Sequence, residues 1–237
     1  MVKHGKHQSK SSVKLSIIIP VFNERETLSQ ILERIQKLPY RTEIIIVDDG
    51  SIDGTRDLFN KIKEPNIKIL MHENNRGKGA AVRTAQPHVT GDFVIIQDAD
   101  LEYQPEEYPE LLAPLLSGQA DVVYGSRFIG PHRAYYFWNF LANKFLNLLS
   151  NLLYNTILSD MECGYKVFRA DIFKNIKIRS NRFDLEPELT AKVFKQNLKV
   201  VEVPITYFGR SYAEGKKITW KDFFPAMWTL IKYRFVD

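Results

Sequence analysis

Two aspartates separated by one residue are the strongest chemical signal in the sequence. Asp98, Ala99 and Asp100 follow an apolar stretch, and Glu102 stands two residues further on. Carboxylates placed in this way at the end of a strand offer hard oxygen ligands to Mg²⁺ or Mn²⁺. A departing diphosphate needs such a cation, because negative charge accumulates on it as its bond breaks. We therefore predict a metal site at Asp98, Asp100 and Glu102, and the alternative is a solvated acidic turn.

A second acidic pair, Asp48 and Asp49, ends another apolar run and is followed by Gly50 and Ser51. A carboxylate at such a point can accept a hydrogen bond from the ring N–H of a base, and the glycine permits a tight turn. This pattern predicts that Asp49 binds a nucleotide. The alternative is a strand-to-helix turn with a capping aspartate.

The segment from Asn74 to Gly79 contains two glycines and the cations Arg76 and Lys78. It precedes a predicted helix, whose N-terminus favours contact with phosphate. The spacing differs from that of a Walker A loop, and the Ser or Thr of that motif is missing. We predict that Arg76 and Lys78 contact the nucleotide, and the alternative is a basic surface turn.

Further cations follow later in the chain: Arg127, Arg133, Arg210, Lys216 and Lys217. Guanidinium groups bind phosphate oxygens in a bidentate way. Each of these residues alone is compatible with a plain surface charge. Together, next to an acidic crevice, they predict a second phosphate site.

The elements that must position these residues alternate between strand and helix patterns. Strands are predicted at residues 15–20, 43–47, 67–71, 92–97 and 121–125, and helices at 24–37, 53–62, 78–86 and 105–116. This order predicts an α/β fold with a mostly parallel sheet flanked by helices. Ligands of such sheets bind beyond the carboxyl ends of the strands, so the acidic pairs are expected to converge on one crevice.

The second half of the chain has a different character. Residues 134–158 are predicted to be helical, with an asparagine at every fourth position from Asn139 to Asn155 and mostly aromatic or aliphatic residues elsewhere. Such a segment is either a core helix or an amphipathic hairpin in the lipid interface. A further helix is predicted at 183–195 and an edge strand at 199–204. Residues 220–235 carry aromatic residues on one side together with Lys221, Lys232 and Arg234, which is typical of an interfacial helix; packing on the domain core is the alternative.

The charge of the chain is concentrated at its start. The net charge is +5, and residues 1–14 contribute +4 through Lys3, Lys6, Lys10 and Lys14 without any acid. The pI of 9.1 therefore reflects a basic tail, predicted to be disordered or attracted to anionic lipid, and no nucleic-acid groove is expected. A single cysteine suits a reducing compartment, and neither a signal peptide nor a transmembrane helix is expected.

Several segments together resemble family 2 glycosyltransferases. They are PVFNE, VDDGSIDGT, NRGKGAAV, QDADLE, GSRF, SDMECGYKVFR and VPITYFGRSYAEGKKI, and they extend from about Leu15 to Ile218. The chain is most similar to the branch that includes dolichyl- and polyprenyl-phosphate mannose and glucose synthases. The resemblance implies a GT-A fold, over residues 15–218. The residue patterns described above add an amphipathic helical insertion at 134–158 and a C-terminal amphipathic helix at 219–237.

The resemblance also implies roles for single residues. Pro20, Phe22, Glu24 and Asp49 match positions that line the nucleotide, and Asp98 and Asp100 match the metal-binding pair. Arg127 and Arg133 match positions that meet the acceptor phosphate, and Lys217 matches a cation near the phosphates. The family often has Gln at the position of Glu102, and its Gly-x-Ser-Lys motif reads Glu214-Gly215-Lys216-Lys217 here.

The resulting hypothesis is an inverting transfer of a hexose from a nucleotide-sugar, of the GDP-mannose or UDP-glucose type, to a polyprenyl or dolichyl phosphate. Asp100, Arg127 and Asp160 are the expected catalytic residues, with Mg²⁺ or Mn²⁺ as cofactor and Arg127, Arg133, Arg210 and Lys217 on the acceptor phosphate. An ionised phosphate needs no strong base, whereas a hydroxyl acceptor would require one, and Asp160 is the candidate. The expected location is peripheral, on the cytoplasmic face of a membrane. The rival hypotheses are a saccharide acceptor and a non-catalytic protein that binds nucleotide-sugars.

Overall fold

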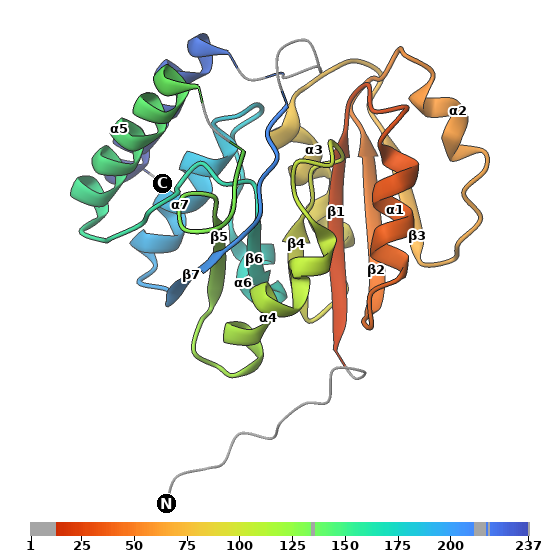
Figure 1. The fold of residues 1–237 in the computed structure, drawn as a ribbon, viewed down its shortest axis with the longest axis horizontal. Coiled ribbons are helices and arrows are strands. Elements are labelled where there is room, and N and C mark those ends of the chain that lie inside the picture. Colours follow the sequence, from red (N-terminus) through yellow and green to blue (C-terminus); the bar gives the residue numbers. More distant parts are fainter. Residues whose placement is uncertain (1–12, 134–135, 211–216, 218, 237) are drawn as a thin grey trace, which may run out of the picture.

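A computed structural model describes residues 13–133, 136–210, 217 and 219–236 (Figure 1). Lys3, Lys6 and Lys10 of the predicted tail, and Lys216, lie outside the described residues. The described part contains a seven-stranded sheet in the order β3-β2-β1-β4-β6-β5-β7. The strands are β1 (Lys14–Val21), β2 (Arg41–Asp48), β3 (Ile67–Met71), β4 (Phe93–Ile96), β5 (Val122–Ser126), β6 (Lys166–Arg169) and β7 (Val200–Pro204).

The mostly parallel sheet predicted from the sequence is confirmed, and so are its six predicted strands within a few residues. The additional strand, β6, pairs antiparallel with both β4 and β5. It is only four residues long and lies inside the motif-rich segment after residue 158, where no alternating pattern marks a strand. β7 occupies the edge of the sheet, as predicted.

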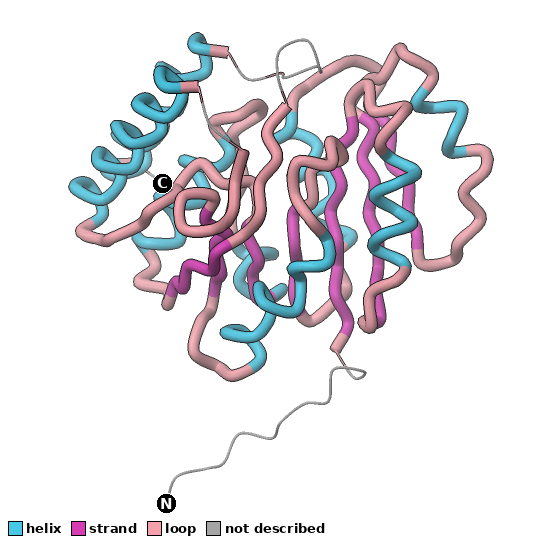
Figure 2. The backbone as a smooth tube through the Cα atoms, viewed as in Figure 1, coloured by secondary structure: helices cyan, strands magenta, loops and turns pink. Residues whose placement is uncertain are grey.

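Helices cover both faces of the sheet (Figure 2). They are α1 (Leu28–Gln36), α2 (Thr55–Phe59), α3 (Lys78–Ala85), α4 (Tyr108–Leu116), α5 (Phe137–Tyr154), α6 (Ala170–Asn175), α7 (Leu185–Lys195) and α8 (Phe223–Phe235). Ile17 and Ile19 of β1 pack in one core with α1 and α4, whereas Ile18 packs in the other core with α3 and α7. Alternate side chains of a strand point to opposite faces, so the uninterrupted apolar runs predicted as strands fill both cores.

The predicted helical insertion is one long helix, α5, and the predicted hairpin is wrong. Asn155 ends α5 in a left-handed conformation with φ of 50°, which asparagine tolerates better than most residues. The partner of α5 is instead α8, and the Tyr154 hydroxyl donates to Leu230 O at 2.7 Å.

The asparagine stripe of α5 faces the protein rather than solvent. Asn147 is buried and accepts from Met161 N at 2.7 Å, and Asn151 exchanges hydrogen bonds with the backbone of Leu158. The opposite side exposes large apolar side chains, namely Phe137, Trp138, Leu141, Phe145, Leu148 and Leu152. α8 likewise exposes Phe224 and Trp228 while it buries Leu230. Each helix therefore packs on the domain and also presents an apolar outer face, and contact of that face with lipid stays a prediction.

The helices that the structure describes include none that is both long and apolar enough to cross a membrane.

Glu43 ties together the amino-terminal ends of three strands. Its carboxylate accepts from Ser16 Oγ at 2.7 Å, from Lys14 Nζ at 2.9 Å and from Thr90 N at 2.8 Å, and also from the Thr90 hydroxyl. Burial alone would raise the pKa of Glu43, but these hydrogen bonds outweigh it and lower the pKa from 4.5 to about 2. The ionised form is therefore stabilised by folding.

We predict that Glu43→Gln lowers the free energy of unfolding at pH 7 by about 2 kcal/mol, because the charge-assisted bonds are lost. The depressed pKa of Glu43 provides stability that is complete above its unfolded value of 4.5 and is lost as the pH falls toward 2. The difference between variant and wild type should thus shrink between pH 5 and pH 3, as measured by urea denaturation. A difference that is constant over this range would contradict the assignment.

Gly77 allows the segment before α3 to approach the segment before α7. It adopts a φ of +98°, and a Cβ at this position would lie 2.3 Å from Asn181 O. Ala80 N donates to the same carbonyl at 3.0 Å, and the Arg83 side chain donates to Ser180 O and to Asn181 Oδ1. These contacts hold α3 next to α7, and both helices supply side chains to the site described below.

Gly77→Ala should destabilise the fold by about 2–4 kcal/mol, because it combines an unfavourable φ with a backbone clash. Gly118 is the matched control, since its φ is +73° but a Cβ there would meet nothing within 4 Å. Gly118→Ala should cost only about 1 kcal/mol. Urea denaturation of the two variants measures the difference, and equal losses would show that the close approach is unimportant.

Candidate active site

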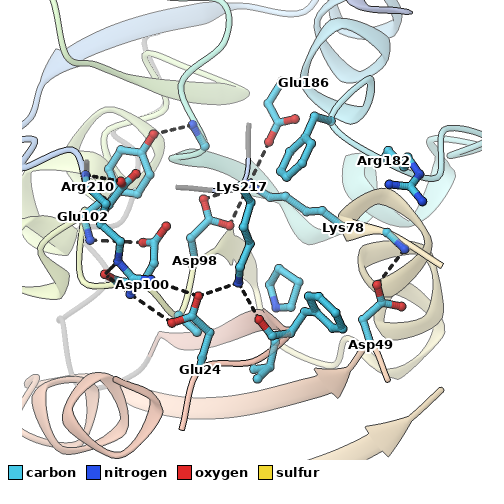
Figure 3. Close-up of a pocket in the computed structure, with 18 of the residues that line it drawn as sticks. Glu24, Asp49, Lys78, Asp98, Asp100, Glu102, Arg182, Glu186, Arg210 and Lys217 are labelled. Atoms are coloured by element: carbon cyan, nitrogen blue, oxygen red, sulfur yellow. Dashed lines mark hydrogen bonds and ion pairs between the residues drawn. The ribbon is translucent and has the colours of Figure 1, made fainter. Parts of the chain in front are cut away.

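A cavity of about 280 Å³ lies at the carboxyl ends of β1, β2, β4 and β5 (Figure 3). Most of the residues predicted from the sequence line it: Pro20, Phe22, Glu24, Asp49, Lys78, Asp98, Asp100, Glu102, Arg127, Arg210 and Lys217. They come from segments that are almost 200 positions apart and meet because parallel strands end at the same edge.

The predicted metal pair lies at the end of β4. Leu101 has a φ of 64°, an unfavourable conformation for this side chain, and the turn lets Glu102 N donate to Asp100 Oδ1 at 3.1 Å. Burial, followed by the negative charges of Glu102 and Asp98, raises the pKa of Asp100 to about 8. A divalent cation would relieve this accumulation of buried negative charge, so the carboxylates of this turn fit a hard metal ion.

Lys78 already supplies one positive charge to this turn. Its Nζ lies 2.7 Å from Asp98 Oδ1 and 2.8 Å from Glu186 Oε1, and all three side chains are largely buried. In the described part of the chain, no three Asp, Glu, His or Cys side chains lie close enough together to hold a metal ion in their present positions. The predicted contact of Lys78 with a nucleotide-sugar therefore competes with its two carboxylate partners.

Glu102, the third predicted metal ligand, is engaged on both oxygens. Tyr207 OH donates to Oε2 at 2.8 Å, and Arg210 N donates to Oε1 at 2.6 Å. Glu102 therefore connects the turn after β4 to the segment after β7. Its role as a metal ligand stays a prediction.

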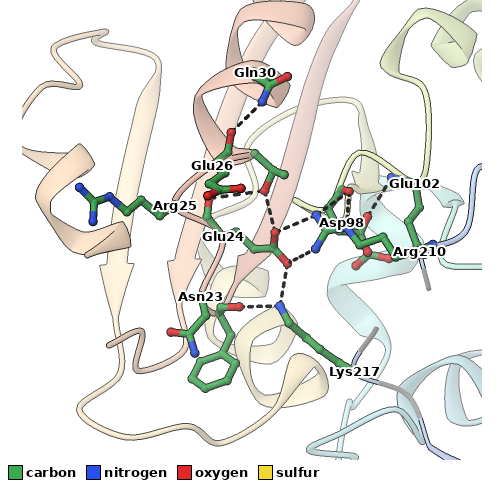
Figure 4. A network of polar contacts seen from close by, with 12 residues as sticks. Asn23, Glu24, Arg25, Glu26, Gln30, Asp98, Glu102, Arg210 and Lys217 are labelled. Carbon is green, nitrogen blue, oxygen red and sulfur yellow. Dashed lines mark hydrogen bonds and ion pairs between the residues drawn. The ribbon is translucent and has the colours of Figure 1, made fainter. Parts of the chain in front are cut away.

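Glu24 is the centre of a second ionic network (Figure 4). Its carboxylate accepts from Lys217 Nζ at 2.7 Å, from Arg210 Nη2 at 3.0 Å and from the Thr27 hydroxyl at 2.6 Å. Burial opposes ionisation, but these partners outweigh it and lower the pKa of Glu24. Lys217 also donates to Phe22 O, and Arg210 donates to Asp100 O at 2.6 Å. The network joins the C-terminal segment to the ends of β1 and β4.

Asp49 organises the loop before α3. Its Oδ1 accepts from Arg76 N at 2.9 Å and its Oδ2 accepts from Gly77 N at 2.7 Å. His72 Nδ1 lies 2.6 Å from Oδ1, and His72 Nε2 lies 2.9 Å from the Thr84 hydroxyl. Asp49 lines the cavity, as predicted, whereas Arg76 is exposed, is not among the lining residues and reaches the site through its backbone.

Asp160 lies beside the cavity and not in it. Its carboxylate binds Arg127 in a bidentate way, with Nε to Oδ2 at 2.7 Å and Nη2 to Oδ1 at 2.7 Å, and it also accepts from Arg127 N at 2.9 Å. Asp160 is buried, and it is absent from the lining of both cavities described here. The geometry favours a role in holding Arg127 rather than the role of a base.

A second cavity, of about 550 Å³, opens next to the first and is mostly aromatic and aliphatic. It runs between α5 and the start of α8 and includes Trp138, Phe140, Phe145, Trp220 and Phe224, with Arg133 also in its lining. We call it the aromatic groove. The residues that line both cavities are Arg127, Glu162, Phe183, Tyr207 and Arg210. Arg133 is exposed and lines only the aromatic groove; it is not among the residues that line the acidic cavity.

Sequence reasoning missed part of this lining. Arg182, Phe183 and Glu186 enter the cavity from the start of α7 and the residues before it, and Tyr207 enters from the segment after β7. The sequence pattern did predict a helix that starts at residue 183, and this was the available signal that these residues lie at a helix N-terminus. What brings that start to the cavity is packing on α3, which local sequence does not reveal.

Comparison with known proteins gives two curated relatives that are each 30% identical to this chain. One is a dolichol-phosphate mannosyltransferase of Pyrococcus furiosus, aligned over 214 residues, which are 86% of this chain and 59% of the relative. The other is an undecaprenyl-phosphate 4-deoxy-4-formamido-L-arabinose transferase of Salmonella choleraesuis, aligned over 210 residues, which are 86% of this chain and 62% of the relative. The chain thus spans about three-fifths of the length of these relatives.

Solved structures share the fold at lower identity. Glucosyl-3-phosphoglycerate synthase of Mycobacterium tuberculosis, in complex with Mn²⁺, UDP and glucosyl-3-phosphoglycerate, has a TM-score of 0.73 at 17% identity and covers 95% of this chain and 81% of its own. A mannosyltransferase of Pyrobaculum calidifontis in complex with GDP-Man and Mn²⁺ has a TM-score of 0.57 at 16% identity and covers 98% of this chain and 73% of its own.

The family assignment rests on the sequence match together with the fold. The sequence profile of glycosyl transferase family 2 matches residues 16–177, which begin within β1, extend past β6 and include the acidic turns that line the cavity. The α/β fold with its mixed sheet, and the solved structures that share this fold, agree with that match. The chain belongs to glycosyl transferase family 2.

Proposed function

We propose that this protein transfers a hexose from a nucleotide-sugar to a polyprenyl phosphate at a membrane surface, with inversion at the anomeric carbon. The observation that carries the proposal is the junction of two unlike cavities. An acidic, cation-rich cavity meets the aromatic groove at Arg127, Tyr207 and Arg210. A reaction between a polar donor and a lipid acceptor needs such a junction.

The donor site is assigned to the acidic cavity. Asp98 and Asp100, with Glu102 as a further candidate, would hold Mg²⁺ or Mn²⁺, which when bound offsets the charge that develops on the diphosphate. Structural neighbours hold Mn²⁺ together with UDP or GDP-Man. Pro20, Phe22, Glu24 and Asp49 lie on the side of β1 and β2 and would contact the nucleotide.

The acceptor site is assigned to the junction and the aromatic groove. Arg127 is held by Asp160 and stacks over the Tyr207 ring at 5.1 Å, so its guanidinium has a defined position. Arg127 and Arg210 would bind the acceptor phosphate on the cavity side, Arg133 would bind it on the groove side, and Lys217 would add positive charge. The apolar chain of a polyprenyl phosphate would then lie along the aromatic groove, where its hydrocarbon leaves water.

The reaction is a single displacement. An ionised oxygen of the lipid phosphate attacks the anomeric carbon on the face opposite the nucleoside diphosphate. The new C–O bond forms as the bond to the diphosphate breaks, and the electron pair of that bond leaves with the nucleoside diphosphate. Because the attacking oxygen carries no proton, Asp160 is free to position Arg127 instead of acting as a base.

The membrane contact is assigned to the outer faces of α5 and α8 and to the 3₁₀ turn Trp220–Asp222. Trp220 and Trp228 are 73% and 63% exposed, more than an aromatic side chain in a soluble domain usually is. Lys221, Lys232 and Arg234 are exposed beside them and suit anionic headgroups. We propose a peripheral location on the cytoplasmic face, with residues 219–236 as the interfacial element and Lys3, Lys6 and Lys10 of the predicted tail as additional charge. Lys14, the fourth cation of that predicted tail, belongs instead to β1 and pairs with Glu43.

The proposed activity is tested with Mn²⁺, UDP-glucose or GDP-mannose, and a short polyprenyl phosphate, by measuring released nucleoside diphosphate and glycolipid. Transfer should require the phosphate on the lipid and should stop on addition of EDTA. Asp100→Asn should reduce transfer at least 100-fold because one carboxylate of the metal pair is lost, whereas Asp57→Asn, at an exposed acid on α2, should not. Transfer only to a saccharide, or binding without turnover on any acceptor, would contradict the proposal.

Membrane contact is tested by sedimentation with vesicles of phosphatidylcholine and phosphatidylglycerol. Combining Trp220→Ser with Trp228→Ser should weaken binding at least tenfold, because two aromatic side chains no longer enter the interface. Ile52→Ser serves as the control, since Ile52 is 88% exposed in the loop before α2. Unchanged vesicle binding by the double variant, with its thermal unfolding intact, would refute the interfacial role.

A further inference from the structure

Glu162 is a polar side chain at the junction that no step of the proposed reaction uses. It lines both the acidic cavity and the aromatic groove. Its Oε1 is fully buried and has no hydrogen-bond partner among the described residues. Buried carboxyl oxygens in native proteins are usually paired, so an unpaired one beside a substrate cavity calls for a partner.

The backbone around Glu162 is firmly held. Met161 N donates to Asn147 Oδ1 at 2.7 Å, and the buried Lys166 ammonium donates to Met161 O at 2.8 Å and to Cys163 O at 2.6 Å. Gly164 N donates to the Tyr103 hydroxyl at 3.0 Å. Glu162 is therefore presented by a fixed loop, as a group that recognises a ligand has to be.

The surroundings restrict the chemistry of the partner. Glu162 and Glu186 line the same cavity, and neither carboxyl group supplies the positive charge that a phosphate needs. The phosphates of donor and acceptor are better served by Arg127, Arg210 and Lys217. In the reaction proposed above, the part of the substrates that lies between the two phosphate sites is the sugar ring with its hydroxyl groups.

We propose that Glu162 hydrogen-bonds a hydroxyl group of the hexose that is transferred, and that it thereby selects the donor sugar. This inference rests on the proposed function and goes beyond it by naming a residue that recognises the sugar. A site built to pair with a hydroxyl discriminates strongly against an analogue that lacks it, because its own polar group is then left unpaired.

The ionisation of Glu162 is compatible with this role. Burial, followed by the negative charge of Glu186, raises the pKa of Glu162 to about 8. A carboxyl group that holds its proton near neutral pH can donate to a sugar oxygen as well as accept from a hydroxyl. Glutamine has the same two capacities and nearly the same shape, whereas alanine has neither.

The test measures binding of UDP-glucose, GDP-mannose and their monodeoxy derivatives in the presence of Mn²⁺ by titration calorimetry. Wild type should bind at least one monodeoxy donor 10-fold or more weakly than the parent. In Glu162→Ala the parent should bind about 10-fold more weakly, and the same deoxy donor should then bind as well as the parent, within twofold. Glu162→Gln should restore most of the wild-type preference, and the affinity for UDP or GDP alone should change in neither variant.

Glu107→Gln is the matched control, because Glu107 also has a buried carboxyl oxygen without a described partner but does not line either cavity. It should leave the sugar preference unchanged. Retention of the full wild-type preference in Glu162→Ala would overturn the role of Glu162 while leaving the proposed transfer intact. If wild type binds neither nucleotide-sugar, the proposed function itself fails, and the inference fails with it.

Discussion

Negative charge buried at the carboxyl ends of the strands has to be balanced, and this constraint organises the site. Asp98 shares the Lys78 ammonium with Glu186, which joins β4 to α3 and α7. Glu24 shares Arg210 and Lys217, which joins β1 to the segment after β7. An unbalanced buried carboxylate is costly, so each acid recruits a cation from a distant segment. These ion pairs therefore hold together the segments that form the cavity wall, and they also place both acidic and basic groups in its lining.

The acids of the site are not equally compensated by cations. Glu24 has two cationic partners and a lowered pKa, whereas burial and neighbouring acids raise the pKa of Asp100 and of Glu162. Groups whose charge is unsatisfied within the protein are those for which a ligand is expected. In our proposals the two groups receive different ligands, a divalent cation at Asp100 and a sugar hydroxyl at Glu162.

Helix α5 reverses the usual arrangement of a surface helix, because its polar stripe faces the protein. Asn147 and Asn151 of α5 satisfy backbone groups of residues 158–161, a segment that contains Asp160 and directly precedes Glu162. Because the polar stripe is used on the inside, the aromatic residues are left on the outside. The same helix thus holds the loop at the junction and offers an apolar surface, which is why we connect membrane contact with the acceptor site.

The sequence by itself determined the alternation of strands and helices and the acids that follow β2 and β4, because apolar periodicity and strand-end chemistry are local properties. It also indicated half of the residues that line the cavity, from Pro20 to Lys217. Local patterns could not reveal β6, the inward-facing asparagines, the bidentate hold of Asp160 on Arg127, or the entry of Glu186 into the cavity. Each of these depends on which segments pack against one another, and only the tertiary structure decides such long-range contacts.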